Sequence, residues 1–254
     1  MTIHLANLSG LILVYFLVFA RTGAMLMLLP PISQAGVPAR VRLALALAVS
    51  VAMAPVVAHD YPSQGPQTPI ALGVMIGEET AAGFLVGAMA SIIMSALSVA
   101  GTLIATQTGL AAAQLLNPTM GDEEPIFGNF LSLLGSVMIF ATNLHHVAIG
   151  AIVGSYTLIP PGAPLPTGDM AELTVRLVSG SFALGFQIAA PFLVFGFVVN
   201  ASIGLLARLM PQLQVFFIAM PVNIIMGFLI LMLLVGTMMT IFLNYYGTQL
   251  GSFA

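Results

Sequence analysis

Long apolar segments separated by short polar, proline-rich connections dominate this chain. The apolar segments cover about residues 8–29, 41–57, 70–106, 126–156, 173–206 and 222–246. A helix needs about 20 apolar residues to cross a bilayer, and most of these segments are at least that long. The pattern therefore predicts an all-α protein with about six hydrophobic segments, built as integral, membrane-associated helical hairpins. Some of the segments are expected to be kinked or not to span lipid.

Prolines mark the ends of several segments. Pro30 and Pro31 end the first one, because proline lacks the amide hydrogen and clashes with the preceding turn. Residues 59–69 and 160–166 are rich in proline and are predicted to form loops. Pro191 lies in the middle of the fifth segment and predicts a kink there.

The third segment is too long for one straight span. Glu78 and Glu79 lie inside it, about eight residues after its start at Ile70. We therefore expect the part before these acids to be interfacial or to form a separate turn.

Composition explains why the chain is expected in a membrane. Of 254 residues only five are basic, all of them arginine, and charged residues make up 5% of the chain. An ordinary soluble domain has about 25%. So few charges exclude a soluble globular enzyme and a nucleic-acid binder, which needs many basic side chains. The absence of cysteine excludes a disulfide scaffold and thiol redox chemistry.

The sequence offers little for catalysis. His145 and His146 are adjacent, so on a helix they point about 100° apart and cannot both face one metal ion. The short motifs of zinc proteases, serine hydrolases and phosphate-binding loops do not occur. We therefore expect no enzyme activity, no cofactor and no metal site.

Glycines spaced four residues apart suit close packing of helices in lipid. Glycine is also common in membrane helices without such a role. Pairs with this spacing include Gly73 and Gly77, Gly83 and Gly87, and Gly150 and Gly154.

A segment of small, polar and apolar residues runs from Gln107 to Pro118. Asn117-Pro118 breaks any helix there. Irregular backbone at membrane depth persists only where it lines a cavity or is buried in protein. The segment is therefore a candidate pore element, and a plain connecting loop is the alternative. The acids at 122–124 before Pro125 are typical of a helix start, with a cation site as the alternative reading.

Two arginines lie in or next to apolar segments. Arg21 is inside the first one, and Arg208 is the only charge between residues 177 and 254. A charge at membrane depth costs at least a few kcal/mol, so it must be paired, reach the interface or serve a function. We interpret both as structural anchors rather than substrate-binding groups.

Residues 204–221, which read GLLARLMPQLQVFFIAMP, resemble the signature of the FliR family of flagellar export-gate proteins and their virulence type III counterparts. Other stretches of the chain are similar to the same family, over about residues 10–245. They are Arg21-Thr22-Gly23 with Leu29-Pro30, residues 37–42, Gly77-Glu78-Glu79 with Gly83 and Gly87, residues 101–118, His146 and Pro160.

The resemblance implies one export-gate domain over residues 1–254, FliP-like over about 1–190 and FliQ-like over about 191–254. It implies FliP-like and FliQ-like membrane subunits and further export-apparatus proteins as partners. On the same resemblance, unfolded proteins are expected to pass through the gate in transit, with membrane lipid around it and no role for nucleic acid. The expected location is the bacterial inner membrane, at the flagellar basal body.

The resemblance also implies roles for particular residues. The loop at about 107–122 is expected to plug the closed pore, with candidate residues Gln107, Gly109, Leu110, Gln114, Asn117 and Pro118. The candidate assembly and anchoring residues are Arg21, Arg208, Pro211, Gln212, Phe216, Phe217 and Pro221.

Two other functions stay open at this point. A virulence secretion subunit would share the fold, but Asn223 stands where that branch typically has lysine. A secondary transporter of small solutes should show an inverted repeat, and the sequence shows none.

Overall fold

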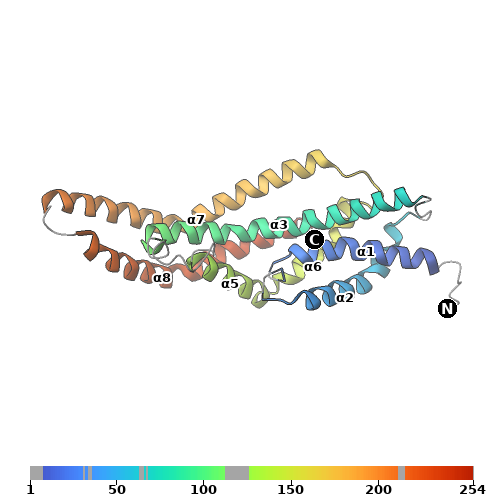
Figure 1. Cartoon of the computed structure of the whole chain (residues 1–254), viewed down its shortest axis with the longest axis horizontal. Coiled ribbons are helices and arrows are strands. Elements are labelled where there is room, and N and C mark those ends of the chain that lie inside the picture. The colour runs from blue at the N-terminus through green and yellow to red at the C-terminus, as the bar shows by residue number, and fades with distance from the viewer. Residues whose placement is uncertain are drawn as a thin grey trace. The chain divides into compact units, whose positions relative to one another are not determined.

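The structure is a computed structural model (Figure 1). In the part of the chain that it describes, the fold is all-α. The described residues are 8–30, 32–33, 36–62, 66, 68–111, 126–210 and 215–253. The helices are α1 (Leu8–Leu28), α2 (Ala39–Val57), the short 3-10 helix η2 (Ala58–Asp60), α3 (Pro69–Gln107), α5 (Ile126–Ala141), α6 (Leu144–Leu158), α7 (Thr167–Leu209) and α8 (Val215–Gly251). Strands are absent from these ranges, which confirms the predicted fold class.

Several helices are long and apolar enough to cross a bilayer. By length and composition these are Ala39–Asp60, Pro69–Gln107, Thr167–Leu209 and Ala219–Gly251. The pair α5 and α6 adds a fifth, broken candidate span, and α1 contributes a shorter apolar helix. The predicted mixture of spanning, kinked and shorter hydrophobic segments is confirmed.

The third segment differs from its prediction. It forms one continuous helix, α3, which passes through Glu78 and Glu79 without a break. The Thr68 hydroxyl accepts a hydrogen bond from the Ala71 amide at 3.1 Å and so caps the start of this helix. The expectation of a separate turn was wrong because the Glu79 carboxylate is neutralised inside the protein by an arginine, as described below.

The fourth segment also differs from its prediction, because it is two helices rather than one. The break falls at Thr142 and Asn143, and Asn143 has a left-handed backbone with φ of 59°. Asparagine tolerates this conformation better than most residues, so Asn143 was the available signal. By contrast, α7 continues through Pro191 as one helix of 43 residues.

The helices form two compact units. One unit holds residues up to 93 together with 139–177 and 246–254, and the other holds 94–138 and 178–245. The long helices α3, α7 and α8 each contribute to both. The predicted division into a FliP-like part (about 1–190) and a FliQ-like part (about 191–254) rests on the family resemblance and not on these units. It stays a prediction.

In the first unit, α1 and α3 pack closely along a row of residues that we call the α1–α3 seam: Glu79, Gly83, Gly87 and Ser91. A methyl group added at Gly83 would collide with the Arg21 carbonyl oxygen, and one added at Gly87 would lie 2.7 Å from the Met25 oxygen. The row runs at four-residue intervals, so it forms one face of α3.

The seam shows which of the predicted glycine pairs brings helices together. The pair in the seam does so, whereas Gly73 and Gly77 have nothing within 4 Å of where a methyl group would stand. At the far end of the seam, the Ser91 hydroxyl donates a hydrogen bond to the Leu28 carbonyl. Residues further along α1 contact residues further along α3, so the two helices run parallel here.

Replacing Gly83 with alanine should lower the melting temperature of the detergent-purified protein, because the new methyl group meets backbone that cannot yield. Overpacking of this kind costs about 1–3 kcal/mol. Gly77→Ala, on the same helix with open space around it, is the matched control. It should leave stability unchanged or raise it, since alanine favours a helix by about 1 kcal/mol. Equal melting temperatures for the two variants would show that the seam is not tightly packed.

Candidate functional site

Arg21 is fully inside the protein and forms an ion pair with Glu79. The Nε atom donates to Glu79 Oε2 at 2.7 Å, and an Nη2 hydrogen bond of 3.2 Å reaches the other carboxylate oxygen. The two side chains are 2% and 1% exposed. This two-point contact is the geometry in which arginine binds a carboxylate most strongly. It joins α1 to α3 at one end of the seam.

The rest of the guanidinium group binds the end of α6. Nη1 donates to the Ser155 carbonyl at 3.1 Å, and Nη2 donates to the Ile159 carbonyl at 3.0 Å. The carbonyls at the C-terminal end of a helix carry partial negative charge. The Ser155 carbonyl also accepts the Ile159 amide at 2.9 Å. Arg21 therefore binds two carbonyls at this helix end and the carboxylate together, and it ties three segments of the first unit.

Two tyrosines complete the surroundings of this pair. The Arg21 guanidinium carbon lies 4.1 Å from the centre of the Tyr156 ring, a cation–π contact. The Tyr61 ring lies 6.2 Å from that of Tyr156. Burial raises the pKa of Tyr61 above its usual range, so its hydroxyl stays neutral at physiological pH. The cluster thus carries one positive and one negative charge inside an aromatic wall.

Sequence reasoning identified Arg21 but not its partners. Glu79 was read as a mark of a helix boundary, and Ser155, Tyr61 and Tyr156 were not singled out. A signal was available, since an arginine and a glutamate each placed in an apolar segment can neutralise each other.

The other predicted anchoring residues lie elsewhere in the chain. Arg208 is exposed in the last turn of α7, where a positive charge suits the helix dipole. Pro221 lies within α8 and is exposed. Phe216 and Phe217 belong to the first turn of α8 by their backbone. Pro211 and Gln212 fall outside the described residues.

The first part of the predicted plug lies at the end of α3. Gln107 is the last residue of that helix, and the Thr108 amide still donates to the Ile104 carbonyl at 3.0 Å. Gly109 has a φ of +75°, the left-handed conformation with which helices commonly end at glycine. Leu110 follows it and is half-buried. Gln114, Asn117 and Pro118 lie outside the described residues.

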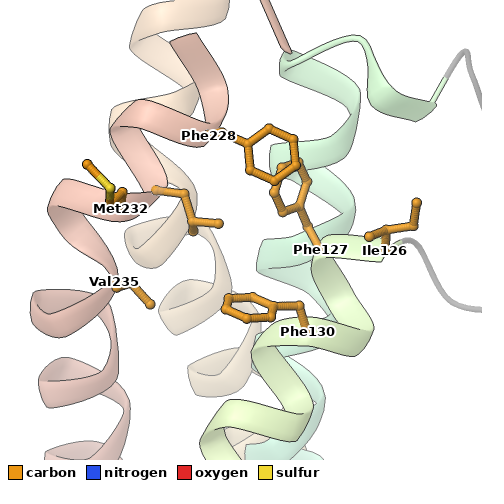
Figure 2. A pocket seen from close by; sticks show the side chains of 7 residues that line it. Ile126, Phe127, Phe130, Phe228, Met232 and Val235 are labelled. Atoms are coloured by element: carbon orange, nitrogen blue, oxygen red, sulfur yellow. The ribbon is translucent and has the colours of Figure 1, made fainter. Parts of the chain in front are cut away.

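An apolar cavity of about 390 Å³ opens between α5 and α8 in the second unit. It is lined by Ile126, Phe127, Phe130, Phe228, Leu231, Met232 and Val235. Figure 2 shows the Phe127 and Phe228 rings side by side at its wall, with centres 5.3 Å apart. These side chains can take up apolar groups, but none of them can perform acid–base or nucleophilic chemistry.

The two adjacent histidines lie at the start of α6. The His145 and His146 rings have centres 4.2 Å apart, and His145 also contacts the Phe140 ring at 5.3 Å. Among the residues placed by the structure, no group of three or more histidine, aspartate or glutamate side chains could hold a metal ion.

Comparison with known proteins now bears on the function. Residues 12–248 match the family described as bacterial export proteins, family 1. The chain belongs to this family. It is 40% identical over 237 residues to the flagellar biosynthetic protein FliR of Caulobacter vibrioides, a match that covers 93% of this chain and 94% of that protein. The resemblance to the FliR family is thereby confirmed.

More distant relatives of this FliR-family chain come from two kinds of system. The flagellar biosynthetic protein FliR of Bacillus subtilis is 27% identical and covers 91% of this chain and 90% of its own length. The Yop proteins translocation protein T of Yersinia pestis is 28% identical, with coverage of 90% and 88%. The chain is therefore a multi-pass membrane component of flagellar or type III export. The relatives' names describe biosynthesis and translocation rather than an enzyme.

Removing one member of the buried ion pair should be far more harmful than removing both. Arg21→Met leaves the Glu79 carboxylate buried without a partner, which typically costs about 3–5 kcal/mol. The double variant Arg21→Met, Glu79→Leu should recover most of that loss, because similar apolar replacements of a buried pair are often neutral. Thermal melting of the purified protein checks this.

The exposed pair of Arg176 and Glu172, at 2.8 Å, is the control for this experiment. Arg176→Met should change the melting temperature little, since exposed pairs contribute about 0–1 kcal/mol. The double variant at Arg21 and Glu79 could instead be as unstable as Arg21→Met alone. That result would show that the unpaired Glu79 carboxylate is not the cause of the instability.

Proposed function

We propose that this chain is the FliR-type subunit of a flagellar protein export gate in the bacterial inner membrane, at the flagellar basal body. In this proposal it assembles with FliP-like and FliQ-like membrane subunits and contacts further export-apparatus proteins. The assembly forms the channel through which unfolded flagellar proteins leave the cell.

The observation that carries the proposal is the near full-length match to a flagellar relative. The Caulobacter protein and this chain align over more than nine-tenths of both, at 40% identity. The virulence relative from Yersinia is 28% identical. The 40% match is what favours the flagellar system, since the Bacillus FliR protein, at 27%, is no more similar to this chain than the Yersinia protein.

The surface of the chain supports a role as a subunit. Only 22% of the most apolar window of α8 and 33% of that of α7 is buried within the chain. The large exposed side chains include Phe197 and Leu205 of α7 and Ile225, Met232 and Leu233 of α8. Such a surface requires lipid or other apolar subunits to cover it. A gate assembly supplies both.

We further propose that the segment from about 107 to 122 helps to plug the closed channel. Its described start at the end of α3 and its small residues, which include Gly109 and Ala111 to Ala113, support this role. Small side chains bury little apolar area, so they can fill a narrow pore without binding a passing chain strongly.

Deleting the gene in its native host should abolish flagellar filaments and swimming while growth stays normal, because the proposed channel for filament subunits is lost. Electron microscopy of cells and swimming assays measure this, with a plasmid copy of the gene as the rescue control. Normal filaments in the deletion strain would contradict the flagellar assignment. Loss of effector secretion instead would indicate the virulence system.

Deleting Leu110 to Leu116 should leave the assembled complex recoverable but make membranes leak small ions, because the channel then lacks its plug. Arg208→Ala should instead reduce recovery of the complex, since it removes an anchoring charge at the end of α7. Ion flux across membranes containing each variant, measured beside the yield of complex, separates the two effects. A tight membrane with no complex after the deletion would mean that the segment is structural.

A further inference from the structure

The arginines of the first unit fall into two kinds. Arg21 and Arg176 each bind a glutamate. Arg40 and Arg42, in the first turn of α2, form no ion pair with an acid in the described part of the chain. A guanidinium group keeps its charge beside an apolar segment, so it needs an anion or water at its polar end.

Arg40 stands at the head of an exposed apolar row on α2. Leu43, Leu47 and Val51 follow it at intervals of three and four residues, so the four side chains lie on one face of the helix. Arg40 is exposed, and the three apolar side chains are 45%, 48% and 60% exposed. We call these four residues the Arg40 row.

The other side of α2 packs within the first unit, against α1 and α6. Its buried residues are Ala46, Ser50, Met53, Ala54 and Val57. Arg42 is half-buried and precedes Ala46 by one turn, so it belongs to this packed side. The Arg40 row therefore points away from the helices that α2 contacts.

The length of the Arg40 row matches one leaflet of a bilayer. Val51 lies eleven residues after Arg40. At 1.5 Å per residue this is about 16 Å along the helix. The hydrocarbon core of a bilayer is about 30 Å thick, so one leaflet contributes about 15 Å. A phospholipid with its phosphate on Arg40 can lay one acyl chain along the whole row.

The two ends of α2 differ in charge. Between Arg42 and Asp60 the chain has no acidic residue, lysine or arginine. A methyl group added at Gly162 would lie 3.8 Å from Pro62 Cγ, so the loops that follow α2 and precede α7 meet at the Asp60 end. The first turn of α7 adds Asp169 near these loops. The basic end of such a helix is expected on the cytoplasmic side, where the leaflet carries negatively charged lipid.

We propose that the Arg40 row binds an anionic phospholipid, with the phosphate on the Arg40 guanidinium group and an acyl chain along the three apolar side chains. Guanidinium binds phosphate through two parallel hydrogen bonds, and Arg42 adds positive charge at the same end of the helix. A purely apolar partner would cover the row but leave Arg40 unpaired. The inference goes beyond the export function and depends only on the chain's place in a membrane.

The test measures binding of fluorescent phosphatidylglycerol to the purified tagged chain, together with the subunits that elute with it. Phosphatidylcholine with the same acyl chains is the comparison, because its headgroup has no net charge. Arg40→Gln should weaken the affinity for phosphatidylglycerol about fivefold, the contribution of one basic side chain near a membrane surface. The affinity for phosphatidylcholine should change much less.

Two further arginine variants serve as controls. Arg40→Lys should keep most of the preference for phosphatidylglycerol, because the positive charge remains. Arg176→Gln should leave both affinities unchanged, since that exposed side chain is already paired with Glu172. Equal phosphatidylglycerol binding by the wild type and Arg40→Gln would overturn the proposal.

The apolar part of the row is tested separately. Leu47→Ala and Val51→Ala should weaken binding of both lipids to a similar extent, because both lipids lose the same acyl-chain contacts. Inorganic phosphate should not displace bound phosphatidylglycerol. Full displacement would mean that the arginine binds free phosphate and that the apolar row contributes nothing, which contradicts the proposal.

Photo-crosslinking in native membranes distinguishes lipid from a partner subunit. With a photoactivatable phenylalanine analogue in place of Val51, mass spectrometry should find an adduct with the mass of an anionic phospholipid. A cross-link to another protein instead would overturn the proposal. If Arg40→Gln does not assemble, this cross-link and the wild-type preference for phosphatidylglycerol over phosphatidylcholine decide, and absence of either contradicts the proposal.

Discussion

A charge pair in an apolar chain has to be satisfied where it lies, because water does not follow it inside. Arg21 meets this requirement by binding Glu79 on α3 and two carbonyls at the end of α6. The contacts need the donor geometry of a guanidinium group, which lysine does not offer. They fix α1, α3 and α6 relative to one another within the first unit. The α1–α3 seam then continues this close packing along about three turns of α3, from Glu79 to Ser91.

Glycine contacts determine how closely and in which register the neighbouring helices pack. In lipid, helices gain little from apolar burial against each other, so close approach of backbones carries more of the association. The seam uses Gly83 and Gly87 in the first unit, and in the second unit Gly101 packs directly on the backbone of Gly128. Each contact permits only one register of the two helices.

The sequence predicted the helical class and most segment ends, because apolar length and proline act locally. It did not predict that α3 continues past Glu79, since that depends on an arginine 58 residues away. The break at Asn143 was missed because apolar residues flank it on both sides. Spacing suggested that Gly73 and Gly83 were equivalent, whereas only tertiary structure shows which one meets a neighbour. Of the site, Arg21 and the end of α3 were identified, but their partners were not.

The central claim is that this chain works as a FliR-type subunit within a gate and not as an independent membrane protein. The most direct measurement is purification of the tagged chain from its native host, with mass spectrometry of the proteins that elute with it in one discrete complex. The account predicts FliP-like and FliQ-like membrane subunits in that complex. A chain that elutes alone as a folded, monodisperse monomer would contradict it.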